Sequence, residues 1–161
     1  MSKPIIRAIR KADNPSLARV IRKVLIDLGA PKVGTALADT SLDSMFETYQ
    51  GKRRVYFVVE EKGIILGGAG IAALKNYDGN ICELQKMYFL DSARGKGLGK
   101  LMLSRCLEAA TSFSFQSCYL ETMSYMMAAQ NLYKKFGFQY LDGPLGDTGH
   151  FSCPVQMLKK L

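Results

Sequence analysis

The chain has 161 residues, 48% of them hydrophobic, which suits one folded domain over residues 1–161 and argues against a disordered segment. No apolar stretch approaches the roughly 18 residues that a membrane-spanning helix needs, and the N-terminus lacks a signal peptide's apolar core, so we expect a cytoplasmic protein. The net charge is +8, but the Lys and Arg residues are scattered along the chain and form no nucleic-acid recognition motif. This favours a small anionic ligand over a specific nucleic acid.

The first half of the chain predicts three strands and two helices. Asn14 before Pro15 is a good start for a helix, because Asn caps free backbone amides and Pro fits the first turn. Glycines within a later apolar run indicate a bulge or the close approach of another group. The expected strands are residues 5–9, 55–59 and 64–74, with a turn at 60–63, and the expected helices are 15–28 and 42–49.

The second half predicts four further strands and two helices. The expected strands are 81–90, 117–122, 138–141 and 150–158, and the expected helices are 98–113 and 126–136. Pro154 places the last strand at an edge or a bulge, because Pro has no amide hydrogen to donate. The predicted order is therefore β-α-α-β-β-β-α-β-α-β-β.

The most informative stretch joins the strand at 81–90 to the helix that follows it. Residues 94–100, Arg-Gly-Lys-Gly-Leu-Gly-Lys, place three glycines and three cations at the start of that helix. Glycines let the backbone approach an anion closely, and the free amides of a first helical turn point toward it. The stretch therefore predicts a phosphate-binding loop.

Two well-known phosphate-binding signatures fit this loop poorly. A Walker-type loop with Gly99-Lys100 as its G-K pair would need Gly at Arg94 and a hydroxyl at Leu101. A dinucleotide fingerprint beginning at Gly95 would need a third Gly at Lys100, and the preceding half-chain lacks βαβ alternation.

The actual spacing, [Q/R]-x-x-G-x-G directly after an E-L-x-x-[LM]-Y-[VF] strand, resembles the acyl-CoA loop of the GNAT superfamily of N-acetyltransferases. Residues 129–138, AQNLYKKFGF, are similar to that superfamily's A-x-x-L-Y-x-K-x-G-F motif, and the two motifs stand in the same order. The resemblance extends over residues 4–160, but only 83–100 and 129–138 are specific.

The resemblance implies an α/β fold with a mixed, mostly antiparallel sheet of about seven strands, splayed between strands four and five and flanked by about four helices. It also implies direct transfer of an acetyl group from acetyl-CoA to a primary amine, with no metal. The residues expected to bind coenzyme A are Arg94, Gly95, Lys96, Gly97, Leu98, Gly99 and Lys100 at the pyrophosphate and Met87, Tyr88 and Phe89 along the pantetheine arm.

Tyr133 matches the superfamily tyrosine that acts as general acid toward the coenzyme sulfur. Glu83 is the leading candidate base, and strand alternation places it on one face with Gln85, Met87 and Phe89. Glu121, His150 or a water relay are the alternatives. One family feature is missing: seven residues before the tyrosine, many members carry an Asn that contacts the coenzyme, and this chain has Met126.

The acceptor has no readable signature. We expect the first two helices and the loops at 30–40 and 142–150 to define its site, with a small-molecule amine favoured over a protein N-terminus or lysine. A non-catalytic acyl-CoA sensor or adaptor is the alternative from another class. Either a monomer or a homodimer fits the sequence.

Overall fold

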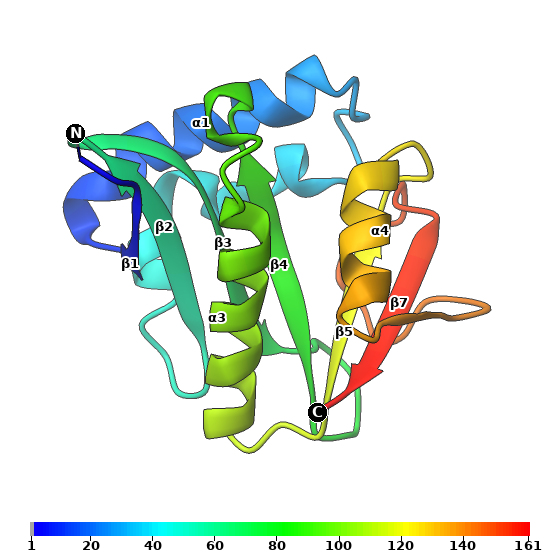
Figure 1. Ribbon diagram of the computed structural model, residues 1–161. Coiled ribbons are helices and arrows are strands. Elements are labelled where there is room, and N and C mark those ends of the chain that lie inside the picture. The colour runs from blue at the N-terminus through cyan, green and yellow to red at the C-terminus, as the bar shows by residue number, and fades with distance from the viewer. Residues whose placement is uncertain (1) are drawn as a thin grey trace.

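The computed structural model describes residues 2–161, and its strands and helices follow the predicted order (Figure 1). Four short 3₁₀ turns precede or connect these elements. The elements are β1 (Ile5–Ala8), α1 (Asn14–Asp27), α2 (Met45–Thr48), β2 (Val55–Glu61), β3 (Ile64–Ala73), β4 (Ile81–Phe89), α3 (Leu98–Ser112), β5 (Ser117–Thr122), α4 (Met127–Lys135), β6 (Gln139–Tyr140) and β7 (Val155–Lys160).

The seven strands form one sheet in the order β1-β2-β3-β4-β5-β7-β6, and every neighbouring pair is antiparallel except β4 and β5. Helices α3 and α4 cover one face, and α1 and α2 cover the other (Figure 1). Each face buries its own apolar cluster, so the sheet is a shared wall between two cores. This architecture confirms the predicted fold class.

Two predicted elements differ in extent. The last strand begins at Val155 rather than at residue 150, because the preceding segment docks on another loop: the Ser152 amide donates to the Gly34 carbonyl at 2.9 Å. The helix expected over 42–49 is a 3₁₀ turn, Thr40–Ser44, followed by the short α2. None of the helices within residues 2–161 combines the length and apolarity needed to span a membrane.

The parallel pair β4 and β5 separates after only three residues. Ile81, Cys82 and Glu83 pair with Ser117, Cys118 and Tyr119, and no residue beyond Glu83 pairs with β5 within the described chain. Beyond that point β4 is bonded only to β3, and β5 only to β7. The sheet is therefore splayed between its fourth and fifth strands, and each of the two strands presents an unpaired edge to the gap.

A bulge in β4 changes which side chains share a face. Gln85 lies opposite Gly70 and Tyr88 opposite Gly68, so Lys86 and Met87 together span the place of one partner residue. Lys86 has a φ of 49°, and its carbonyl accepts a hydrogen bond from the buried Tyr56 hydroxyl at 2.7 Å. The Tyr56 hydroxyl therefore stabilises the bulged backbone at Lys86.

The predicted common face of Glu83, Gln85, Met87 and Phe89 is wrong for this reason. Met87 and Phe89 pack in the core beneath α3 and α4, whereas Tyr88 packs in the core beneath α1 and α2. The extra residue at the bulge reverses the alternation after Gln85. One strand thereby contributes Glu83 to one side of the splay and Met87 to the other.

Glycines in β3 make room for Tyr56. A Cβ added at Gly70 would lie 2.6 Å from Tyr56 Cδ2 and 2.6 Å from the Val55 carbonyl oxygen. The intrastrand glycines therefore mark close approach by a buried ring, as their pattern indicated.

We predict that Gly70→Ala lowers the free energy of unfolding by about 1–3 kcal/mol, because the methyl group overpacks against Tyr56 and backbone. Gly143→Ala is the matched control, since nothing lies within 4 Å of its added Cβ. Denaturant unfolding of both variants measures the difference. Equal stability of the two variants would contradict the claim that Gly70 makes room for Tyr56.

Candidate functional site: a cleft at the splay between β4 and β5

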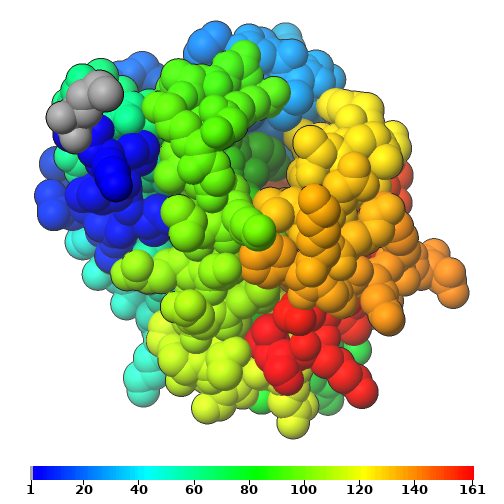
Figure 2. Space-filling model, viewed as in Figure 1, coloured from blue at the N-terminus to red at the C-terminus, as the bar shows by residue number. Residues whose placement is uncertain are grey.

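A cleft of about 420 Å³ opens where β4 and β5 separate. Met87, Tyr88 and Phe89 line it from β4, and Leu132 and Tyr133 line it from α4. Figure 2 shows the surface hollowed between the green segment that follows β4 and the yellow and orange segment around α4. The cleft thus runs along the unpaired edge of β4.

The glycine loop lies at the mouth of this cleft. Gly95 and Gly97 have φ values of 74° and 71°, which L side chains rarely adopt, and nothing lies within 4 Å of the positions where their Cβ atoms would be. Arg94 and Gly99 line the cleft itself. This open, left-handed loop at the start of α3 has the shape and dipole that bind phosphate groups.

The cationic and apolar side chains of the loop differ in surroundings. Lys96 Nζ lies 3.3 Å from Glu61, and Arg94 Nε lies 3.3 Å from Asp91, both near the surface. The Leu98 side chain is buried in the core beneath α3, so it offers the site only its backbone. Lys100 is exposed. Both surface ion pairs are weak enough to be exchanged for an incoming anion.

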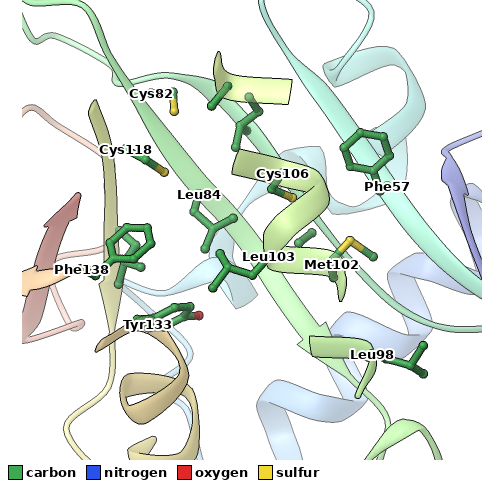
Figure 3. Packing of buried hydrophobic residues seen from close by; sticks show 14 of the residues in the cluster. Phe57, Cys82, Leu84, Leu98, Met102, Leu103, Cys106, Cys118, Tyr133 and Phe138 are labelled. Atoms are coloured by element: carbon green, nitrogen blue, oxygen red, sulfur yellow. The ribbon is translucent and has the colours of Figure 1, made fainter. Parts of the chain in front are cut away.

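Tyr133 is a buried side chain that reaches the cleft. Its ring packs against Phe138 with centroids 5.8 Å apart, and its hydroxyl points from α4 toward β4 (Figure 3). Burial raises the pKa of Tyr133. Among residues 2–161 this hydroxyl has no protein hydrogen-bond partner. Tyr133 therefore holds a proton at the wall of the cleft.

Glu83 stands where β4 and β5 begin to separate, with only 6% of its surface exposed. Its Oε1 accepts a hydrogen bond from Gln85 Nε2 at 2.8 Å, and Gln85 Oε1 in turn accepts one from the Tyr49 hydroxyl at 2.5 Å. Burial raises the pKa of Glu83 to about 7. At neutral pH this carboxylate can both hold and release a proton.

The three side chains considered as alternative bases lie together. One side-chain oxygen or ring nitrogen from each of Glu83, Glu121 and His150 lies within 4.8 Å of the other two. Glu121 is on β5 and also lines the cleft, and His150 comes from the loop before β7. The sequence offered them as competitors, whereas the fold makes them neighbours.

A second set of polar contacts holds His150 in place beside the two glutamates, and it includes a residue that sequence reasoning missed. Asp39 lies 2.8 Å from Lys86 Nζ and 3.1 Å from His150 Nε2. Burial acts to raise the pKa of Asp39, but the His150 hydrogen bond and the Lys86 charge lower it overall. Burial likewise acts to lower the pKa of His150, but the bond to Asp39 raises it overall. Only the position of Asp39 in the 30–40 loop hinted at a role.

The missing family asparagine is not replaced from nearby. Met126 lines the cleft, and its sulfur accepts a hydrogen bond from Thr122 Oγ1 at 3.2 Å. Asn131, the nearest asparagine along α4, is exposed. The wall near Met126 is therefore less polar than the family pattern implies.

Comparisons with known proteins agree on one kind of activity. The family model described as "Acetyltransferase (GNAT) family" matches residues 29–138. The uncharacterized N-acetyltransferase YjgM of Escherichia coli (strain K12) is 43% identical over 159 residues, covering 98% of this chain and 95% of that protein.

Two solved structures show the same fold over nearly the whole chain. An acetyltransferase of the GNAT family from Staphylococcus aureus Mu50 superposes with a TM-score of 0.79 at 17% identity, over 99% of each chain. A GNAT superfamily phosphinothricin acetyltransferase from Sinorhizobium meliloti, in complex with AcCoA, superposes with a TM-score of 0.75 at 22% identity, covering 98% of this chain and 88% of the other.

The raised pKa of Glu83 makes a prediction about stability. Because it exceeds the ordinary value of 4.5, the stability from burying neutral Glu83 is complete below 4.5 and is lost as the pH rises through about 7. Glu83→Gln cannot ionise, so above pH 7 we expect it to be more stable than wild type, by on the order of 3 kcal/mol.

Denaturant unfolding of wild type and Glu83→Gln on both sides of this range measures the effect. The two proteins should have similar stabilities below pH 4.5, diverge between about 4.5 and 7, and differ by a constant amount above that range. A stability difference that does not change with pH would show that Glu83 has an ordinary pKa.

Proposed function

The chain belongs to the GNAT family of acetyltransferases, and on that premise we propose that it transfers an acetyl group from acetyl-CoA to the primary amine of a small molecule. It is accordingly an acyltransferase. The observation that carries the proposal is that Tyr133 and Glu83 flank the point where β4 leaves β5, with the unpaired edge of β4 between them.

We assign the coenzyme to the cleft and the glycine loop. The backbone amides of residues 95–100, with Arg94, Lys96 and Lys100 around them, would hold the pyrophosphate. The free edge of β4 at Met87, Tyr88 and Phe89 would receive the pantetheine arm, whose amides can pair with a strand as another strand does. The open space at Gly95 and Gly97 and the volume of the cleft support this assignment.

In the proposed reaction, Glu83 takes a proton from the acceptor's ammonium group, directly or through one water. The neutral amine attacks the thioester carbonyl carbon, and the carbon–sulfur bond breaks as the carbon–nitrogen bond forms. Tyr133 protonates the departing sulfur and is reprotonated as the new amide nitrogen loses its extra proton. A Glu83 pKa near 7 and a protonated Tyr133 hydroxyl suit these two roles.

A small acceptor is favoured by how the acceptor side is covered. The 30–40 loop and the segment before β7 are tied together across it by the Ser152–Gly34 and His150–Asp39 contacts. This covering favours a small amine over a protein segment. The name of the Sinorhizobium meliloti structure also specifies a small-molecule acceptor, phosphinothricin.

Tyr133→Phe tests the general acid. We expect kcat to fall by about 10²–10⁴-fold for every accepted amine, because the sulfur loses its proton donor. Acetyl-CoA should still raise the melting temperature of the variant, because the binding loop is intact. Tyr140→Phe, on β6 outside the cleft, is the control. Unchanged turnover in Tyr133→Phe would remove this residue from the mechanism, and a wild-type Tm unaffected by acetyl-CoA would contradict the coenzyme assignment.

The pH profile tests the base. Because Glu83 must be ionised to accept the proton, kcat/KM for the amine should rise with pH and level off above about 7. Glu83→Gln should lower kcat/KM and lose this rise. Thiol release measured across pH provides both results. A Glu83→Gln profile that kept the wild-type rise would assign the base elsewhere.

A further inference from the structure

Two carboxylates face the splay without a Lys or Arg partner among residues 2–161. Within residues 2–161, no Lys or Arg nitrogen lies within 4.0 Å of the carboxylate oxygens of Glu83 or Glu121. The nearest cation on β4, Lys86, is already paired with Asp39 at 2.8 Å. The titratable His150 is the one group beside them that can carry a positive charge, so an outside cation can take that role when the imidazole is neutral.

The second carboxylate is held in place. Glu121 Oε2 accepts a hydrogen bond from the Tyr119 hydroxyl at 2.6 Å, and its other oxygen accepts one from the Thr148 hydroxyl. Thr148 Oγ1 also accepts a hydrogen bond from the backbone amide of His150 at 3.1 Å. Glu121 and His150 are therefore fixed relative to each other by one threonine.

Glu83 completes the group from the opposite strand. It is more than nine-tenths buried, and only its Oε1 has a protein hydrogen-bond partner within the described chain. The remaining carboxylate oxygen is available to the space that Glu121 and His150 share. The cluster is thus built from two strands and a loop around one small volume.

The spacing of the cluster suits an ammonium ion. His150 makes no ion pair within 4.0 Å of either glutamate, yet the three acceptor atoms lie within 4.8 Å of one another. Three acceptors bonded to one tetrahedral nitrogen at about 2.8 Å lie about 4.6 Å apart. Three ligands of a tetrahedral zinc at about 2.1 Å would lie only about 3.4 Å apart. The limit of 4.8 Å on all three separations, with both His150–glutamate separations above 4.0 Å, accommodates the first arrangement.

We propose that Glu83, Glu121 and His150 act as one unit, an ammonium cage, in which Glu121 and His150 hold the acceptor's charged amine while Glu83 stands ready to take its proton. This inference rests on the proposed acetyl transfer and adds that the acceptor binds as a cation with three N–H donors. Glu121 and His150 are then binding residues rather than rival bases.

His150 gives this cage a spectroscopic signal of its own. It is the only histidine in the sequence, so the imidazole resonances of the untagged protein come from a single ring, and its Hε1 resonance can be followed alone. A cation placed in the cage disfavours a second positive charge on the ring, and its resonance should move toward the position of neutral imidazole. The charged and titratable groups that face the ring are Asp39, Lys86, Glu83 and Glu121.

The test compares two cations at one fixed pH. Propylammonium has three N–H donors, whereas tetramethylammonium has the same charge and none. We expect a saturable shift of the His150 resonance with propylammonium, no shift with tetramethylammonium, and loss of the propylammonium shift in Glu121→Gln. Glu108→Gln, which alters an exposed carboxylate on α3, should behave as wild type.

A second measurement is the KM for each substrate. A general loss of structure would change both KM values, whereas loss of an amine contact changes only the KM for the amine. In Glu121→Gln we expect KM for an accepted primary amine to rise about tenfold or more, as when a charge-assisted hydrogen bond is lost, with KM for acetyl-CoA unchanged. If this variant folds poorly, the contrast between the two cations in wild type decides alone.

The outcomes separate this inference from the proposed function. Equal shifts with both cations, no shift with propylammonium, or an unchanged amine KM in Glu121→Gln would overturn the cage, even if acetyl transfer is observed. A selective propylammonium shift in a protein that neither binds nor consumes acetyl-CoA would keep the cage and overturn the acetyltransferase mechanism.

Discussion

The bulge at Lys86 is the constraint on which the site depends. β4 presents side chains of the site on both faces of the sheet. Glu83 faces the side covered by α1 and α2, while Met87 and Phe89 face the side covered by α3 and α4. A regular strand would place all of these odd-numbered residues on one face. The buried Tyr56 hydroxyl holds the extra residue, and the glycines of β3 make room for that ring. The placement of Glu83 and Met87 on opposite faces of β4 therefore depends on β2 and β3, away from the cleft.

The second constraint is electrostatic. Burying Glu83 costs stability at neutral pH, and the same burial gives its carboxyl a pKa suited to proton transfer. The pKa of the neighbouring Asp39 is lowered instead, because His150 and Lys86 stabilise its ionised carboxylate. At neutral pH the two acidic groups therefore differ in protonation: Asp39 is ionised in an ion pair, whereas Glu83 is close to its pKa and can exchange a proton.

Sequence patterns predicted the order of strands and helices and the glycine loop at the start of α3, because each depends on local spacing, whereas Tyr133 was singled out by the resemblance to the GNAT superfamily. They could not place Glu83, Glu121 and His150 together, because the splay after Glu83 and the docking of the segment before β7 arise from tertiary contacts. The face reversal after Gln85 was missed for a related reason: Lys86 is an ordinary residue to find in a strand, and its positive φ depends on Tyr56, thirty residues earlier. Asp39 carried no local signal beyond its place in a long loop.

The central claim is that the unpaired edge of β4 and the glycine loop together hold coenzyme A. Amide hydrogen exchange with and without coenzyme A tests it most directly, because it reports on individual backbone groups. The account predicts slower exchange in two separate stretches, residues 87–89 and residues 95–100, with little change in β1 or β6. Protection confined to other segments, or none at saturating coenzyme A, would contradict it.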